Sequence, residues 1–182
     1  MYNIKLKIKE CGSINELEEF IRDNNIKLVL FGEYHGFVKQ IQIQRKILKK
    51  VLPKFFLYEM LEENIILNDK NTQRFLSKPN NKDFSSVSTY GQLKPIVNLA
   101  RSFNLPLIGC DIKNMGVDKN WRENKFSDKE ARNITRKREL RQAEIINRYA
   151  SKGLVFALLG DYHLRKSSLI FPKLRVKKAI LV

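Results

Sequence analysis

Both histidines of this chain occur in the same short context, which is the first indication of a chemical site. His35 lies in "GEYHG" at 32–36, and His163 lies in "GDYHL" at 160–164. The chain has 8 Gly, 19 acidic residues and 6 Tyr among 182 positions, so a given His follows Gly-acid-Tyr with a probability of roughly 0.0002. The repetition therefore predicts a shared role for the two imidazoles.

Four acidic residues each follow a short apolar segment that is typical of a buried strand. Glu33 follows "LVLFG" and Glu59 follows "FFLY". Asp111 follows "PLIGC" and Asp161 follows "FALLG". In an open parallel α/β sheet the ligand site lies at the carboxyl ends of the strands, where the connecting loops leave. We therefore expect these four carboxylates to meet at one edge of a sheet. The alternative for each acid is capping of the helix that follows.

The two tetrapeptides add the imidazoles to that edge. If the backbone stays extended after each glycine, Glu33 and His35 point to one side, and so do Asp161 and His163. The tyrosine between acid and histidine then points to the other side, where it packs or where its phenol could ligate the iron of a haem. This expectation concerns Tyr34 and Tyr162.

Several carboxylates in one pocket repel one another and need compensation by a bound cation, an arginine or shared protons. Imidazole and carboxylate together are suitable ligands for zinc, manganese, iron or cobalt. A divalent metal with an open position would lower the pKa of a bound water and so assist hydrolysis, with Glu33 or Glu59 as general base. The candidate metal ligands are His35, Glu59, Asp111, Asp161 and His163.

Length and composition favour one α/β domain over residues 1–182, because a hydrophobic content of 43% suffices for one core of ordinary size. No apolar run is long enough to span a bilayer, and the opening "MYNIKLKIKE" alternates where a secretory signal would be continuously apolar. Cys11 and Cys110 are too few for a disulfide framework. These features predict a cytoplasmic protein with reduced thiols, and they leave its oligomeric state open.

The formal net charge of +16 is concentrated in two segments, 37–54 and 164–182, which contain lysine and arginine but no acid. A basic surface can attract nucleic acid, anionic membranes or anionic substrates. A lysine-rich surface that serves only solubility is the alternative. Since neither segment contains a recognisable nucleic-acid-binding motif or many aromatic residues, nucleic acid is the least favoured partner.

The periodicity of the chain predicts an α/β fold with a mainly parallel central sheet and helices on both faces. Continuous apolar runs predict buried strands at 27–35, 54–60, 105–111 and 154–163. A period-2 segment at 1–10 and the apolar run at 177–182 predict two terminal strands. We place these two strands at an antiparallel edge.

Helices are expected at 13–25, 38–52, 91–104 and 127–152, although the Ile-Gln alternation at 41–44 would also suit a strand. In the third of them Pro95 would lie in the first turn, where its missing N–H does little harm. Residues 61–77 are weakly helical in pattern. Residues 78–90 are rich in turn formers and predict a loop that could serve as a lid.

The paired motifs resemble a superfamily that joins the haem-binding uptake protein ChaN, erythromycin esterases, the Tiki proteases and the TraB and GumN proteins. Its members carry a "GExH" after an early strand, a glutamate after the next strand, an arginine on a late helix and a second "GxxH". This chain is similar at "FGEYHG", "LYEM" and "LLGDYHL". In "RELRQAEII", Arg138 stands in the arginine position and Gln142 stands where the family has a methionine.

The resemblance, which spans about residues 27–164, implies an active-site set of Glu33, His35, Glu59, Arg138 and His163. Tiki members are metal-dependent proteases, erythromycin esterases open a lactone and ChaN binds haem. The resemblance therefore implies a hydrolase of ester or peptide bonds, with or without a divalent metal, that acts on a small molecule or a peptide. The alternative is a haem-binding or metal-binding protein without turnover.

A toxin domain related to this superfamily uses a Cys-His-Asp triad, which draws attention to Cys110 beside Asp111. A catalytic thiol needs its base within hydrogen-bond distance and a lowered pKa. In a regular strand Cys110 faces the side opposite to Asp111. The pattern therefore disfavours thiol catalysis.

Overall fold

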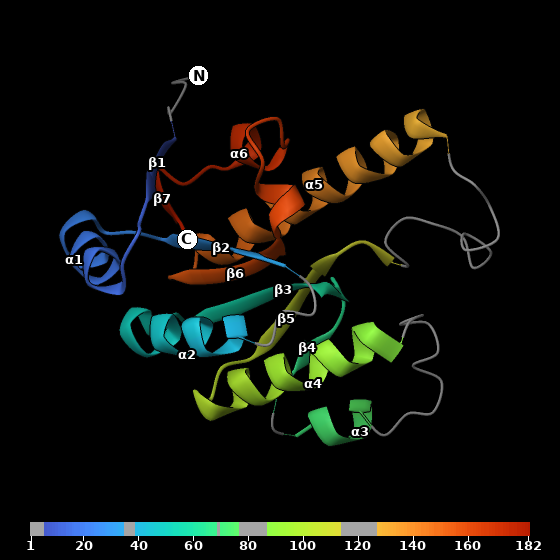
Figure 1. The fold of residues 1–182 in the computed structure, drawn as a ribbon, viewed down its shortest axis with the longest axis horizontal. Coiled ribbons are helices and arrows are strands. Elements are labelled where there is room, and N and C mark those ends of the chain that lie inside the picture. The colour runs from blue at the N-terminus through green and yellow to red at the C-terminus, as the bar shows by residue number, and fades with distance from the viewer. Residues whose placement is uncertain (1–5, 35–38, 69, 77–86, 114–126) are drawn as a thin grey trace.

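The computed structural model describes residues 6–34, 39–68, 70–76, 87–113 and 127–182 (Figure 1). His35 and the first half of the expected strand at 1–10 lie outside the described residues. The expected loop at 78–90 is described only from Val87 onward.

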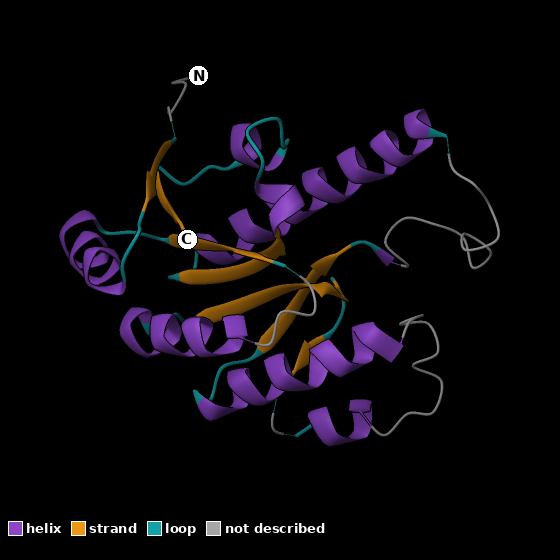
Figure 2. Ribbon diagram, in the orientation of Figure 1, coloured by secondary structure: helices purple, strands orange, loops and turns teal. Residues whose placement is uncertain are grey.

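A seven-stranded sheet forms the centre of the described structure, with the order β1-β7-β2-β6-β3-β5-β4 (Figures 1 and 2). Its strands are β1 (Lys7–Glu10), β2 (Leu28–Glu33), β3 (Phe55–Glu62), β4 (Ile66–Leu67), β5 (Leu107–Asp111), β6 (Val155–Gly160) and β7 (Lys178–Leu181). All neighbouring pairs in this order are parallel except β4 and β5, which are antiparallel. The predicted fold class is confirmed.

The antiparallel edge is not the one expected, because both terminal strands are parallel to their neighbours. β1 pairs with β7, and β7 pairs with β2, in the same direction. Helix α1 (Ile14–Asn24) connects β1 to β2, and residues 161–177 connect β6 to β7. Each connection is long enough to cross over the sheet, so the chain re-enters it from the same end. β4 is antiparallel because only residues 63–65 separate it from β3.

Helices cover both faces of the sheet (Figure 2). The remaining helices are α2 (Lys39–Val51), α3 (Thr72–Leu76), α4 (Val87–Ser102), α5 (Asp128–Ala150), the 3-10 helix η3 (Asp161–Leu164) and α6 (Ile170–Lys173). Buried residues of α1, α2 and α4 form one core with one face of the sheet. Buried residues of α5 and α6 form a second core with the other face.

Helix α4 begins earlier than expected. Its first residue, Val87, belongs to the predicted loop, so Pro95 lies in the helix interior rather than in the first turn. An interior proline costs about 3 kcal/mol, and burial of the apolar face of the same helix offsets that cost. This face consists of Leu93, Ile96, Val97, Leu99 and Ala100. The segment 61–77, expected to be weakly helical, contains the end of β3, then β4 and α3.

Helix α5 is the predicted long helix, and its first turn forms a capping box. The Ser127 hydroxyl accepts a hydrogen bond from the backbone N–H of Glu130, and the Glu130 carboxylate accepts one from the backbone N–H of Ser127. Among the described helices, α5 included, none is long and apolar enough to cross a membrane.

Candidate active site

The two repeated motifs end neighbouring strands. β2 and β6 pair in parallel, with Gly32 opposite Leu159 and Glu33 opposite Gly160. A Cβ atom added at Gly32 would lie 3.0 Å from Oδ1 of Asp161, so this glycine leaves room for the acid of the other motif. The repetition in the sequence therefore reflects two adjacent positions at the carboxyl edge of the sheet.

The backbone of the second motif is not extended, contrary to the expectation. Asp161 begins the 3-10 helix η3, which leaves Asp161 and Tyr162 exposed and buries His163. Successive side chains of a 3-10 helix are about 120° apart. The acid and the imidazole of this motif therefore do not point to the same side.

His163 lies between two buried glutamates. Its Nε2 atom is 3.8 Å from Oε2 of Glu59, and its Nδ1 atom is 3.5 Å from Oε1 of Glu139. All three side chains are buried. The imidazole therefore has a carboxylate beside each ring nitrogen, in an interior that screens charge weakly.

Glu139 is a site residue that the sequence motifs do not indicate. Its fully buried carboxylate accepts hydrogen bonds from Nη1 of Arg165, at 2.5 Å, and from the backbone N–H of Leu169, at 2.8 Å. The available signal was helical spacing, because Glu139 shares the buried face of α5 with residues three, four and seven positions later. Those residues are Gln142, Ala143 and Ile146.

Glu59 is positioned by an irregularity in β3. The predicted strand at 54–60 contains Glu59, but β3 continues to Glu62, and its register against β5 shifts between Tyr58 and Glu62. Glu59 therefore lies where the pairing of β3 with β5 is irregular, and such an irregularity changes the direction of side chains. A Cβ atom added at Gly109 of β5 would lie 1.9 Å from the carbonyl oxygen of Glu62, so the close approach of the two backbones requires glycine there.

Glu33 is the last residue of β2 and is buried beside Tyr58. Burial, the charges of Glu33 and Glu59, and a hydrogen bond with the Glu33 side chain raise the pKa of Tyr58 well above its usual value. The phenol therefore keeps its proton and donates a hydrogen bond to the Glu33 carboxylate. This contact orients Glu33 at the strand end.

Arg138 of α5 and Asp111 of β5 form a bidentate ion pair. The Nε and Nη2 atoms of Arg138 lie 2.9 Å and 2.5 Å from Oδ2 of Asp111. Burial raises the pKa of Asp111 above its ordinary value, although the contacts with Arg138 act in the opposite direction. The arginine at the position indicated by the family resemblance thus provides the positive charge beside one of the predicted acids.

A cavity of about 610 Å³ opens over these groups at the carboxyl edge of the sheet. Five of the predicted residues line it, namely Glu33, Glu59, Arg138, Asp161 and His163. The two tyrosines also line it, and Tyr34 is 67% exposed and Tyr162 60% exposed. The expectation that these rings pack on the opposite face is therefore wrong.

The predicted metal ligands are only partly brought together. Within the described residues, no three His, Cys, Asp or Glu side chains are grouped so that they could hold a metal ion. Asp111 is bound by Arg138 and Asp161 is exposed, so the predicted ligands that lie close together are Glu59 and His163. Because His35 lies outside the described residues, metal binding and haem binding stay predictions.

Cys110 faces the core, as the alternation along its strand predicts. It is fully buried in the hydrophobic cluster that contains Leu57, Ile145 and Ala157. The pKa of the Cys110 thiol is raised well above its usual value, and burial is the largest cause. Since a nucleophilic cysteine needs a lowered pKa, this environment disfavours catalysis by Cys110.

Comparison with known proteins identifies the fold but no family. No protein-family model matches the chain, and no curated protein is significantly similar in sequence. The fold is similar to that of RRSP, a MARTX toxin effector domain from Vibrio vulnificus CMCP6. The sequence identity is 16%, the TM-score is 0.51, and the match covers 85% of this chain and 31% of RRSP.

A second similar structure, described as bacterial protein toxins, has 18% identity and a TM-score of 0.52, with 94% of this chain and 36% of that chain covered. The chain spans about a third of the length of each of these proteins. At such low identities the likeness shows the fold alone. The resemblance to the ChaN and Tiki superfamily stays a prediction.

Proposed function

We propose that this chain is a hydrolase of ester or peptide bonds and that its active site is the cavity at the carboxyl edge of the sheet. The observation that carries the proposal is the placement of His163 between Glu59 and Glu139 beside that cavity. A buried imidazole with a carboxylate at each nitrogen is suited to proton transfer. The resemblance of the paired motifs to ChaN, erythromycin esterases and Tiki proteases supports the same class of reaction.

In the proposed mechanism Glu139 holds the orientation of the His163 ring, Nε2 of His163 takes one proton from the attacking water, and Glu59 beside Nε2 stabilises the imidazolium that forms. The 3.8 Å between Nε2 and Oε2 of Glu59 is too long for a direct hydrogen bond, and a water can bridge such a separation. The water oxygen bonds to the carbonyl carbon of the substrate. The same proton then passes to the leaving alkoxide or amine as the C–O or C–N bond breaks.

Arg138 supplies positive charge where the carbonyl oxygen becomes an oxyanion. Its Nε and Nη2 atoms are held by Asp111, which fixes the plane of the guanidinium, and the residue lines the cavity. A fixed cation in a partly buried site stabilises developing negative charge without reorganisation. Asp111 acts here as the residue that positions Arg138.

The sequence motifs suggest a variant of this proposal in which a divalent metal assists the hydrolysis. Glu59 and His163 present a carboxylate and an imidazole side by side, a donor set that fits zinc, manganese, iron or cobalt. His35, by its place in the motif, would be the third ligand. When bound, the metal would lower the pKa of a coordinated water.

Activity assays on a panel of aryl esters and a fluorogenic peptide library test the proposal. The wild type, His163→Ala and Glu59→Gln are compared, each with EDTA and with added Zn²⁺ or Mn²⁺. The control is Glu63→Gln, which removes a nearby acid that pairs with Arg141 outside the cavity. We expect both site variants to lose at least about 100-fold in rate and the control to keep its rate.

Full activity of His163→Ala, or inactivity of the wild type on every ester and peptide with each metal, would overturn the proposal. Loss of activity in EDTA with recovery on adding one metal assigns the metal-assisted form. Activity that EDTA does not change assigns the metal-free form.

A further inference from the structure

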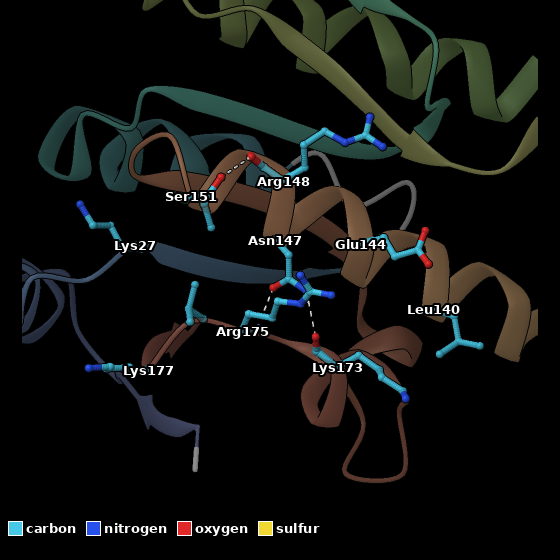
Figure 3. Close-up of a pocket in the computed structure, with 11 residues that line it drawn as sticks. Lys27, Leu140, Glu144, Asn147, Arg148, Ser151, Lys173, Arg175 and Lys177 are labelled. Carbon is cyan, nitrogen blue, oxygen red and sulfur yellow. Dashed lines mark hydrogen bonds between the residues drawn. The ribbon is translucent and has the colours of Figure 1, made fainter. Parts of the chain in front are cut away.

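A second pocket lies at the opposite edge of the sheet, with a volume of about 780 Å³ (Figure 3). Lys27 directly precedes β2 and Lys177 directly precedes β7, and these two parallel strands both begin at this edge. The other wall is the C-terminal half of α5. On this helix Arg148 lies about 15 Å along the axis from Arg138 of the candidate active site. The two pockets share no lining residue and are therefore separate sites.

The lining of this pocket is strongly cationic. Five of its side chains are basic, namely Lys27, Arg148, Lys173, Arg175 and Lys177. Within the part of the chain that the structure describes, none of the five lies within salt-bridge distance of a carboxylate. The one acid of the lining, Glu144, is paired with Arg141, with Nη1 and Oε2 2.5 Å apart. Among the described residues, no salt bridge therefore compensates the five basic side chains of the pocket.

Asn147 of α5 fixes the segment that carries three of these cations. Its Nδ2 atom donates to the carbonyl oxygen of Lys173, at 2.8 Å, and its Oδ1 atom accepts from the backbone N–H of Arg175, at 2.7 Å. Figure 3 shows Arg175 beside Asn147, with Lys173 to one side and Lys27 and Lys177 to the other. The cations thus follow one another along a backbone that is held in place.

We propose that this pocket binds a linear oligophosphate group, either a free chain such as tripolyphosphate or the triphosphate of a nucleotide. Lysine and arginine donate charge-assisted hydrogen bonds to phosphate oxygens, and successive phosphates match successive cations. The volume is in the range of small-molecule sites. No aromatic side chain is among the described residues that line the pocket, so it lacks the stacking surface that single-stranded nucleic acids use.

Isothermal titration calorimetry of the full chain with tripolyphosphate, ATP and adenosine at about 150 mM salt tests this inference. The pocket variant is Arg175→Glu with Lys177→Glu. The control is Lys46→Glu with Lys49→Glu, two exposed lysines of α2 whose reversal changes the net charge equally. We expect the wild type and the control to bind tripolyphosphate or ATP alike, and the pocket variant to lose at least about tenfold in affinity.

Equal affinities for tripolyphosphate and ATP would assign the phosphate chain as the ligand. Tighter binding of ATP than of tripolyphosphate would assign a nucleotide. Equal losses in the pocket and control variants would overturn the proposal, because attraction would then come from the +16 charge as a whole. Absence of tripolyphosphate and ATP binding, with or without binding of a single-stranded RNA oligomer, would also overturn it. If the double variant does not fold by circular dichroism, Lys173→Glu takes its place.

Discussion

The carboxylate of Glu139 lies 3.5 Å from Nδ1 of His163 and is fixed on its other side by Arg165 and by the backbone of Leu169. Both of these donors follow His163 within a few residues, in the segment that leads from η3 to α6. A single buried side chain of α5 therefore holds the segment that carries the histidine. Glu139 is therefore the acid that faces Nδ1 of the imidazole.

Glu139→Gln should lower kcat by about 100-fold with little change in KM, because the substitution removes a charge that orients the His163 ring but does not touch the substrate. Its stability should fall by about 1–3 kcal/mol, since donors that bonded a carboxylate then face an amide. Steady-state kinetics and thermal unfolding measure the two effects. Glu139→Asp should recover part of kcat, and unchanged kcat in Glu139→Gln would contradict a positioning role.

Arg138→Met should destabilise the protein by about 3 kcal/mol at neutral pH, because the buried Asp111 carboxylate loses its partner. The matched control is Arg141→Met on the same helix, which breaks the more exposed contacts with Glu63 and Glu144 and should cost less than about 1 kcal/mol. Chemical unfolding of the two variants measures the difference. Equal losses in the free energy of unfolding of the two variants would contradict a larger contribution from the buried pair of Arg138 and Asp111.

The same Arg138→Met variant should show a defined pH dependence. Burial already raises the pKa of Asp111, and loss of the opposing arginine raises it further. The folded state then keeps a proton on Asp111 at pH values where the unfolded chain has lost it, so stability falls as pH rises through that window. The stability deficit relative to wild type should therefore be smaller near pH 4 than at pH 7, and a constant deficit would contradict this assignment.

Cys110→Ala should retain the hydrolytic activity and cost about 1 kcal/mol of stability. The thiol is fully buried and its pKa is raised by burial, so it is neither accessible nor ionised. Titration with a thiol reagent should modify Cys11, which is partly exposed, before Cys110 in the native protein and both in denaturant. Inactivation by modification of Cys110 alone would point to thiol catalysis.

Gln142→Met should raise the stability by about 1 kcal/mol. Gln142 is fully buried, and neither atom of its amide has a hydrogen-bond partner in the described part of the chain. Methionine fills a similar volume without a polar group and stands at this position in the resembling superfamily. Gln142→Ala, which leaves a cavity, is the control and should lower the melting temperature. A lower melting temperature for Gln142→Met would instead reveal a partner for the amide.

Local patterns in the sequence were sufficient for the fold class and for the gathering of several candidate residues at one edge of the sheet. Continuous apolar runs identify the buried strands, because a strand covered on both faces needs no polar side chain. The loops that follow parallel strands leave the sheet at its carboxyl edge. The sequence alone therefore predicts that the motifs at Glu33 and His163 lie together. The pairing of Arg138 with Asp111, in contrast, was not predicted from the sequence.

Other features depend on how distant segments pack, and these only the tertiary structure decided. The direction of β1 and β7 follows from crossovers that cover the sheet, which no local pattern encodes. The irregular pairing at Glu59 occurs where the backbone of β3 closely approaches Gly109 of β5. Glu139 was not predicted as a site residue because an acid on a helix is usually solvated, and helical spacing indicates only that it could be buried. It comes to lie beside His163 only when α5 packs against the sheet.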